Sequence, residues 1–259
     1  MAYQTIIFEV ADNHVGTLTL NRPEQLNAFS TQLATELYQA LAEMEADTRV
    51  RVVIIKALGK AFCAGIDLNE LQDKATLEYQ RWFTLMESPL AAISTMKKPV
   101  IAQVNGVAAA NGAGLVAACD LAIASDSAKI GLTAINVGLN CVGPVVPVAR
   151  SIGRKRALEL LFFGELIPAS RALELGLINR VVAKEDLDRE TMAWAASLAH
   201  KSPLALQIAK RAFYVAEDMD YHKAFEYMHE AFARLCSTDD AKEGVAAFLE
   251  KRQAHWTES

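Results

Sequence analysis

The chain has 259 residues, enough for one large domain or two smaller ones with a substantial core. Hydrophobic residues make up 52% of the sequence and charged residues 22%, a balance typical of globular rather than disordered proteins. The formal net charge of −5 argues against nucleic-acid binding, so we expect no nucleic-acid partner.

The four cysteines are far apart and form no CxxC pair, which argues against a disulfide framework; they are Cys63, Cys119, Cys141 and Cys236. Unpaired cysteines suit a reducing compartment. The opening MAYQTIIFEVADNHV lacks the basic start and long apolar run of a secretory signal. We therefore expect a cytoplasmic protein.

Taken in chain order, the first third predicts alternating strands and helices. Residues 5–10 and 15–20 are predicted strands around an Asp-Asn turn. Residues 30–46 predict a helix that begins at Ser30, a typical N-cap residue, and places its apolar residues at helical spacing. This order indicates a protein that mixes strands and helices.

The middle of the chain continues the pattern. Residues 51–56 enclose the apolar run VVII, which predicts a strand buried on both faces. The Lys97-Lys98-Pro99 sequence should end a helix before a strand at 100–104, and another strand is predicted near 121–124. The alternation predicts an α/β fold, with helices packed on a layered sheet.

Residues 99–119 raise the question of a membrane span, because these 21 residues carry no charge. The segment nevertheless contains a proline, three polar side chains and three glycines, and many of its other residues are alanines. We predict a strand, a turn and a buried helix here, and no membrane partner.

Beyond about residue 185 the sequence predicts helices only, at 187–200, 203–217, 221–235 and 241–251. We place the division between an α/β core, residues 1–194, and a helical region, residues 195–259. No low-complexity linker separates them, so the helical region should pack on the core or on another subunit.

Several common sites are not indicated. His222 and His229 lie on one predicted helix face, but no Cys, Asp or third His completes a metal set, and we expect no metal. No GxSxG or P-loop motif is present, and the GxG at residues 112–114 lacks the rest of the dinucleotide fingerprint.

Two loops carry more information, residues 60–67 and 105–114. Each reads as a strand, a turn of small residues and the start of a helix. The first N–H groups of a helix have no partner within it, small residues let a ligand approach, and the helix dipole favours negative charge. Two such turns facing one another would hold an oxyanion, although either turn alone also suits a close helix–strand contact.

Taken together, these segments resemble the crotonase (enoyl-CoA hydratase/isomerase) superfamily nearly end to end. The segments that match are NRPEQLNA (21–28), KAFCAGIDL (60–68), KPVIAQVNG (98–106), ALELGLINRVV (172–182) and TDDAKEGVAAFLEKR (238–252). The segment NVGLNCVGP (136–144) is similar to the branch called enoyl-CoA hydratase domain-containing protein 3.

The resemblance implies a spiral of ββα units with a C-terminal helical trimerisation region, assembled as a homotrimer or a dimer of trimers. It implies an acyl-CoA thioester substrate, with coenzyme A as part of the substrate and no permanently bound cofactor. The implied oxyanion donors are the backbone N–H groups of Ile66 and Asn111. Many family members have glycine where this chain has Asn111.

The resemblance also implies the residues that bind substrate: Leu26, Ala28, Ala64, Gly65, Asp67, Leu68, Val107, Gly112, Gly114, Ala134, Cys141, Phe248 and Lys251. Phe248 and Lys251 match tail positions that reach the coenzyme A of a neighbouring subunit. Asp67 could equally be an N-cap, and Lys251 a solvated helix residue.

Two glutamates that serve hydratases of this family are missing. Their positions fall on Gly114 and Ala134, and the acid of some isomerases falls near Val142. No Asp or Glu occurs from Lys129 to Arg150. Because a positioned general acid or base contributes roughly 10²–10⁴ in rate, simple hydration meets a real objection.

The resemblance implies an enoyl-CoA hydratase/isomerase-like lyase of fatty acid metabolism, and the missing glutamates leave three hypotheses. In the first, a displaced acid or base works, with Glu87 as the candidate because relatives place catalytic groups in that region; Glu87 could also simply face solvent. Cys141 could contact substrate, although a packed thiol explains it as well. The second is decarboxylation, which needs no protein base and has a methylmalonyl-CoA precedent in the family. The third is a non-catalytic acyl-CoA binder.

Overall fold

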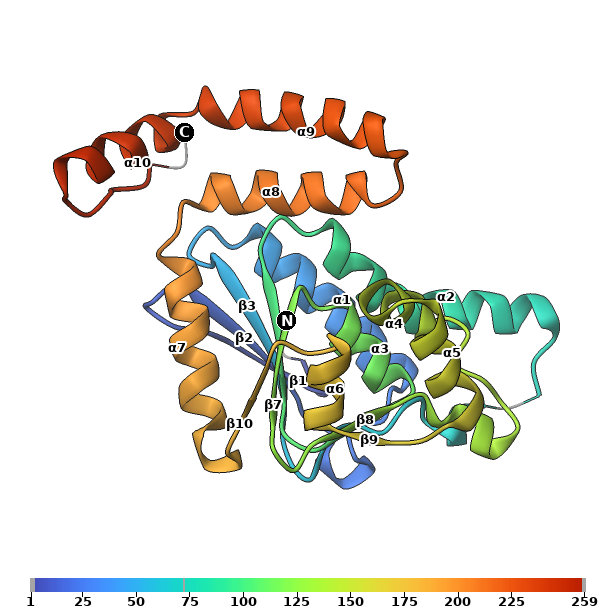
Figure 1. Cartoon of the computed structure of the whole chain (residues 1–259). Coiled ribbons are helices and arrows are strands. Elements are labelled where there is room, and N and C mark those ends of the chain that lie inside the picture. The colour runs from blue at the N-terminus through green and yellow to red at the C-terminus, as the bar shows by residue number, and fades with distance from the viewer. Residues whose placement is uncertain (1–2, 72, 258–259) are drawn as a thin grey trace.

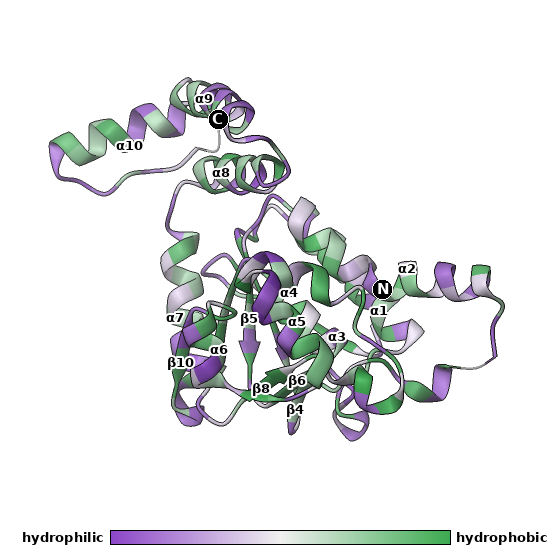
Figure 2. Ribbon diagram, turned by 45° about the vertical axis from the view of Figure 1, so that its right-hand side comes forward, coloured by the Kyte–Doolittle hydropathy of each residue, from purple (hydrophilic) through white to green (hydrophobic). Residues whose placement is uncertain are grey.

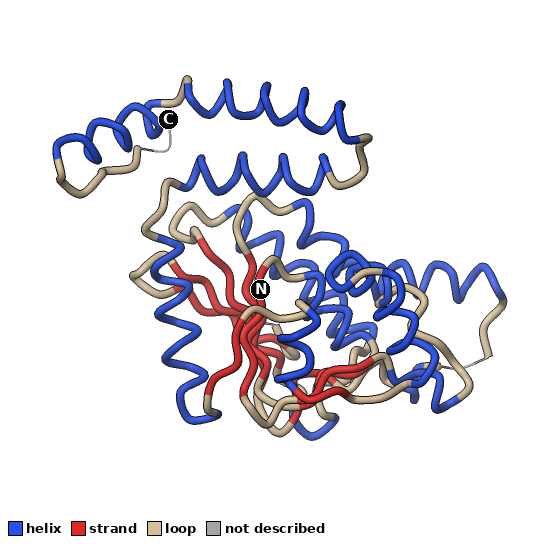
Figure 3. The backbone as a smooth tube through the Cα atoms, in the orientation of Figure 1, coloured by secondary structure: helices blue, strands red, loops and turns tan. Residues whose placement is uncertain are grey.

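The computed structural model describes residues 3–71 and 73–257, and its strands form two sheets that lie at an angle to one another (Figure 3). The larger sheet has the order β1-β2-β3-β5-β7-β10. Its strands are β1 (Ile6–Val10), β2 (Val15–Leu20), β3 (Val52–Ala57), β5 (Val100–Val104), β7 (Leu121–Ser125) and β10 (Arg180–Val182). Only β1 runs antiparallel to its neighbour.

The smaller sheet has the order β4-β6-β8-β9. Its strands are β4 (Ala61–Cys63), β6 (Val107–Ala109), β8 (Lys129–Gly131) and β9 (Ile167–Pro168). The pairs β3–β4, β5–β6 and β7–β8 each give one strand to each sheet, and helices follow each pair. This repetition is the spiral of ββα units expected from the sequence.

Ten α-helices are found in the described part of the chain. They are α1 (Thr31–Ala46), α2 (Thr76–Thr95), α3 (Asn111–Ala118), α4 (Val145–Ile152), α5 (Arg154–Phe163), α6 (Ala169–Leu175), α7 (Leu187–Ala199), α8 (Pro203–Ala216), α9 (Tyr221–Cys236) and α10 (Asp239–Glu250). The predicted N-cap is confirmed, because the Ser30 hydroxyl accepts a hydrogen bond from the Leu33 N–H at 3.1 Å.

Both faces of the larger sheet are buried, as the apolar run in β3 predicts. Val53 and Ile55 join the main core with α1, α2 and α3, whereas Val52 and Ile54 face α7. Figure 1 shows α7 along the outer side of this sheet, apart from the other helices. Alternation along a strand therefore places successive side chains in two different clusters.

The uncharged segment 99–119 forms the predicted strand, β5, and the predicted buried helix, α3, with a second short strand, β6, that was not predicted between them. All eight residues of α3 but one are buried. Among the described residues, none of the helices combines the length and hydrophobicity that a bilayer crossing requires. The segment is apolar because it passes twice through the centre of the fold.

The helices after α7 lie outside the core: α8 and α9 stack above the sheets, and α10 projects to one side (Figure 1). The division predicted at residue 195 falls within α7, which packs on the sheet as far as Ala199. A buried ion pair joins α8 to the core, since Lys210 Nζ lies 2.7 Å from Asp120 Oδ2. The Tyr214 hydroxyl donates to the same carboxylate at 2.9 Å.

Candidate functional site

The two small-residue turns lie side by side, because the strands that lead into them are neighbours. β4 and β6 pair in parallel, with Ala61 opposite Val107. A Cβ added at Gly112 would collide with the carbonyl oxygen of Cys63, and one added at Gly65 would lie 3.0 Å from the Ala110 Cβ. The small residues thus allow direct backbone contact between the turns.

The Ile66 N–H is turned away from its neighbouring segment. Phe29 donates its N–H to the Gly65 carbonyl at 2.7 Å and accepts the Asp67 N–H at 2.8 Å, forming an isolated parallel bridge with Ile66. In such a bridge the intervening N–H points to the opposite side. The Ile66 N–H accordingly points toward the side of β6 and α3, and it donates to no other described residue.

The Asn111 N–H is a free donor for a different reason. Asn111 is the first residue of α3, so its N–H has no partner within the helix. Ala110 before it has a φ of 49°, a conformation that costs a non-glycine residue about 1–3 kcal/mol and that is often found at functional sites. This turn directs the Asn111 N–H away from the helix, where it too meets no acceptor among the described residues.

One prediction about these turns is wrong. The turn at residues 64–66 does not lead into an α-helix but into a single 3-10 turn, Leu68–Glu70. Asp67 caps this turn by accepting the Asn69 N–H at 3.2 Å. A helix dipole therefore acts on the site only from α3, whose buried N-terminus favours a negative charge.

Arg22 and Asn27 hold the first turn in place. Both belong to the segment NRPEQLNA (21–28), but the sequence did not single them out as site residues. Arg22 Nη2 lies 3.0 Å from Asp67 Oδ2, and this hydrogen-bonded ion pair lowers the pKa of that carboxyl. The buried Asn27 amide donates to the carbonyls of Leu58 and Ala61 at 2.8 and 2.9 Å. A buried amide must find hydrogen-bond partners, and this requirement is the signal that could have drawn attention to Asn27.

The residues expected along the substrate path divide between the site and the surface. The Leu26 carbonyl accepts the Ala64 N–H at 3.1 Å, so the turn around Leu26 and Ala28 adjoins the first small-residue turn. Leu68 is exposed. Phe248 is 81% exposed, and Lys251 ends α10 in a left-handed conformation, outside the core.

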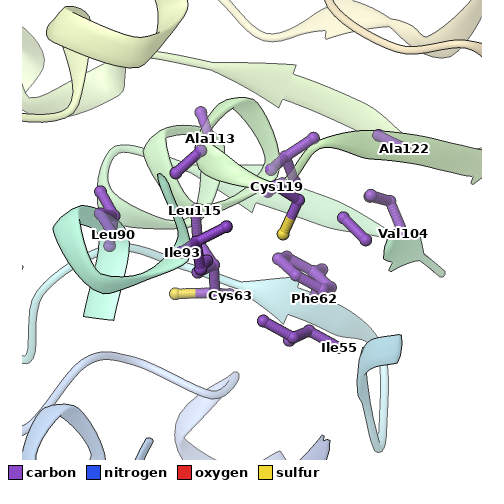
Figure 4. Packing of buried hydrophobic residues seen from close by; sticks show 14 of the residues in the cluster. Ile55, Phe62, Cys63, Leu90, Ile93, Val104, Ala113, Leu115, Cys119 and Ala122 are labelled. Carbon is purple, nitrogen blue, oxygen red and sulfur yellow. The ribbon is translucent and has the colours of Figure 1, made fainter. Parts of the chain in front are cut away.

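The position of the first missing glutamate has no room for a side chain. A Cβ at Gly114 would lie 2.7 Å from the Pro144 Cβ and 3.0 Å from a Leu90 methyl group. Figure 4 shows Leu90 of α2 beside the helix that carries Ala113. The packing of Pro144 and Leu90 against Gly114 thus leaves no space for a side chain at this position.

The second position, Ala134, lies in the 3-10 turn Thr133–Val137, where its carbonyl accepts the Gly138 N–H. The thiol of Cys141 is hydrogen-bonded to the Ala134 backbone, and burial raises the pKa of this thiol. Cys141 is thus a buried thiol whose raised pKa makes it a poorer nucleophile than an exposed one. Val142, near which the acid of some isomerases was expected, is 74% exposed and has no acidic group.

Glu87 lies against the loop that follows Ala134. A Cβ at Gly143 would overlap the Glu87 carboxylate, and Gly143 precedes the Pro144 that packs on Gly114. Burial raises the pKa of Glu87, and no described residue donates a hydrogen bond to it. Glu87 is half-buried and lines a cavity, and it lies close to the loop that follows Ala134.

No group of three or more metal-ligating side chains occurs in the described residues. His222 and His229 instead make ring contacts with Tyr221 and Phe225 on α9. The arrangement as a whole offers one backbone donor at the start of α3, a second on the adjacent turn, and one half-buried carboxylate nearby. Such a set can hold a developing oxyanion and exchange a proton.

Comparisons with known proteins identify the family of the chain. The family model described as enoyl-CoA hydratase/isomerase matches residues 11–259. The crystal structure of an enoyl-CoA hydratase from Mycobacterium smegmatis is similar, with a TM-score of 0.95 and 39% identity over 98% of this chain and 99% of that one.

The human mitochondrial enoyl-CoA hydratase domain-containing protein 3 is 36% identical over 244 residues, which are 94% of this chain and 80% of that protein. Its crystal structure has a TM-score of 0.93, with 34% identity over 98% of this chain and 100% of that one. The predicted similarity to this branch is confirmed.

Proposed function

The chain belongs to the enoyl-CoA hydratase/isomerase family, and from this premise we propose that it binds an acyl-CoA thioester and stabilises its enolate. The thioester oxygen would accept hydrogen bonds from the backbone N–H groups of Ile66 and Asn111. The observation that carries the proposal is that these two donors lie on adjacent turns and meet no acceptor within the described chain. One such donor contributes about 3–4 kcal/mol to a reaction that develops an oxyanion.

The proton step falls to Glu87 in this proposal. The Glu87 carboxylate removes a proton from the α carbon of the thioester, and the electrons of the broken C–H bond pass to the carbonyl oxygen as an enolate. Return of the proton to a different carbon would isomerise a double bond. A carboxylate whose pKa burial has raised is a stronger base than an ordinary glutamate, which favours this step.

Decarboxylation is the second candidate. Pro144 and Leu90 pack beside Gly114 and leave no space for an acid or base at that position, which favours a reaction that needs no protein base. Here the substrate's own carboxylate leaves as carbon dioxide, and the electrons of the broken C–C bond form the same enolate. No protein base takes part in that step. Binding without catalysis is the remaining outcome, because the donors alone suffice to hold a thioester.

We propose that the protein works as a homo-oligomer, a trimer or a dimer of trimers. Of the 16 residues of α9, only Ala231 is buried, and large apolar side chains such as Phe225 and Phe232 are exposed. Figure 2 shows hydrophobic stretches on α8, α9 and α10, away from the core. Apolar faces of this size indicate a surface that another copy covers, and they would bring Phe248 and Lys251 to a neighbour's substrate.

A reducing compartment suits the protein, because all four cysteines are free thiols. We propose the cytoplasm. The human relative, in contrast, is named as a mitochondrial protein.

Mass spectrometry in heavy water tests the function. The protein is incubated with butyryl-, crotonyl-, 3-hydroxybutyryl- and methylmalonyl-CoA, and we expect deuterium at the α carbon of butyryl-CoA. Glu87→Gln should abolish that exchange, whereas the control Glu230→Gln on the exposed face of α9 should retain it.

The other outcomes separate the candidates. Loss of carbon dioxide from methylmalonyl-CoA, equal in wild type and Glu87→Gln, would establish decarboxylation and remove Glu87 from the reaction. Binding without any change in the four thioesters would establish a non-catalytic binder. Absence of binding would refute the proposed function.

A further inference from the structure

Asn111 has a side-chain amide for which the proposed function so far has no use. The residue is only 7% exposed, yet this amide makes no hydrogen bond to any other residue that the structure describes. The rest of α3 consists of glycine, alanine, leucine and valine, so no other side chain of the helix can pair with it. Because buried amides are almost always hydrogen-bonded, a ligand or a water molecule must supply the partner.

The amide lies at the same end of α3 as the proposed oxyanion donor. Asn111 is the first residue of the helix, and its own N–H is that donor. In an α-helix every Cα–Cβ bond tilts toward the N-terminus, so this side chain leans toward the end at which the free N–H groups lie. A thioester whose oxygen is held by the Asn111 N–H therefore brings its first acyl carbons next to the amide.

The covalent structure of Asn111 favours one position for a polar group on the ligand. The path from the backbone nitrogen to the amide nitrogen contains as many bonds as the path from the thioester oxygen to an oxygen on the third acyl carbon. Two hydrogen bonds can therefore form side by side, one to each of these oxygens. An oxygen on the second carbon is one bond nearer to the thioester oxygen, and a hydrocarbon chain offers the amide no partner.

We propose that the Asn111 side chain makes the site selective for 3-oxoacyl thioesters, whose 3-oxo oxygen accepts a hydrogen bond from the amide. This inference rests on the proposed function, because the backbone N–H groups of Ile66 and Asn111 must hold the thioester oxygen. When the second carbon loses a proton to a base, a C–H bond breaks and its electron pair spreads over both oxygens. The N-terminus of α3 favours this shared negative charge.

The missing glutamates favour the same class of substrate. A carbon between two carbonyl groups loses a proton more readily than the α carbon of a simple acyl group, because two oxygens share the resulting charge. Such a substrate needs less help from a protein base, and Gly114 and Ala134 provide none. A 3-hydroxyacyl group lacks this advantage, since its hydroxyl oxygen cannot take up the charge.

Isothermal titration calorimetry with acetoacetyl-CoA and butyryl-CoA tests the inference, because these two thioesters differ only in the 3-oxo group. We expect the wild-type protein to bind acetoacetyl-CoA at least tenfold more tightly, as hydrogen bonds to a charged acceptor allow. Asn111→Gly should reduce this ratio to about twofold or less. The matched control is Thr76→Gly, which places glycine at the exposed first residue of α2 and should keep the wild-type ratio.

Ultraviolet absorption tests whether Asn111 acts on the 3-oxo oxygen itself. The enolate of acetoacetyl-CoA absorbs at longer wavelength than its keto form. With the sites saturated at neutral pH, the wild-type and Thr76→Gly complexes should show at least threefold more enolate absorption than the Asn111→Gly complex. Equal enolate absorption in the wild-type and Asn111→Gly complexes would overturn the inference.

The binding results separate failure of this inference from failure of the proposed function. If the wild-type protein binds both thioesters equally, or if Asn111→Gly leaves their ratio unchanged, the amide keeps a water molecule and the inference is refuted. If neither thioester binds, the proposed function itself fails.

A second variant covers the case in which Asn111→Gly does not fold. Asn111→Asp suits the first turn of a helix, where an acidic residue is stabilising. Its carboxylate should repel the enolate, so we expect the affinity for acetoacetyl-CoA to fall at least tenfold more than that for butyryl-CoA. Equal losses for the two thioesters would contradict the inference.

Discussion

The two ends of α3 use opposite kinds of chemistry. At its N-terminus, backbone N–H groups are exposed by glycine and alanine, and no charged side chain of α3 takes part. Just beyond its C-terminus, Asp120 is held by the Lys210 ammonium, the Tyr214 hydroxyl and the Val100 N–H. The first end leaves hydrogen-bond donors free, whereas the second pairs a buried charge with three donors.

The difference separates ligand binding from structural attachment. Free donors at a helix start remain available to a ligand, and small residues keep the approach open. The three donors hold the buried Asp120 carboxylate in place, and two of them come from α8, which is thereby tied to the core. Substitutions at the N-terminus of α3 should therefore impair ligand binding, whereas substitutions around Asp120 should lower stability.

Lys210→Met should have the largest effect on stability, because it leaves the Asp120 carboxylate buried without its cation. Breaking such a pair costs about 3–5 kcal/mol in the free energy of unfolding. Denaturant titration at fixed protein concentration measures it. The control Lys223→Met removes an exposed ion pair of α9, which should change stability by less than about 1 kcal/mol. Similar losses in both variants would contradict a special role for Asp120.

Gly112→Val should impair both stability and binding. Its side chain would collide with the Cys63 carbonyl, and overpacking of this kind costs about 1–3 kcal/mol. Separation of the turns should also weaken butyryl-CoA binding at least tenfold in calorimetry. Gly153→Ala is the control, since its left-handed φ of 77° carries a similar cost but it lies between α4 and α5. Unchanged binding by a folded Gly112→Val protein would refute the adjacency of the donors.

Glu87→Gln should give a small gain in stability that depends on pH. Burial raises the pKa of Glu87, so the folded state holds this proton more tightly than the unfolded state. The wild-type free energy of unfolding consequently falls as pH rises from about 4 through the raised pKa. The variant lacks this loss, and we expect it to be the more stable protein at pH 7 and equal to wild type below pH of about 4. A less stable variant at pH 7 would show that the carboxylate has a favourable partner.

Asn111→Gly should have the smallest effect, because the proposed donor belongs to the backbone. We expect butyryl-CoA affinity to stay within about twofold, with a stability loss of no more than about 1 kcal/mol from glycine in the first helical turn. Calorimetry and denaturant titration measure the two quantities. A large loss of affinity would indicate that the Asn111 side chain, rather than its N–H, contacts the ligand.

Local patterns predicted much of the fold. The apolar run in β3 and the helical spacing in α1 identified buried strands and an amphipathic helix, and the small residues at 110–114 marked a backbone approach. The turn after Asp67 was less predictable, because Leu68–Glu70 carries no clear preference between a 3-10 turn and an α-helix. The correct predictions and the incorrect one all depended only on residues that are close in sequence.

Contacts between side chains that are far apart in sequence could not be predicted. Asp120 and Lys210 are 90 residues apart, and a single charge on each side gives no pattern. The position of Glu87 against Gly143 depends on how α2 meets the loop after β8, which no local spacing encodes.

The most direct test of the proposed oxyanion site compares butyryl-CoA with S-butyl-CoA, a thioether in which a methylene group replaces the carbonyl. Both carry the same coenzyme A and the same number of acyl carbons. Two hydrogen bonds of about 0.5–1.5 kcal/mol each predict that the thioester binds roughly tenfold or more tightly in calorimetry. Equal affinities would show that the carbonyl meets no donors, and would contradict the assignment of Ile66 and Asn111.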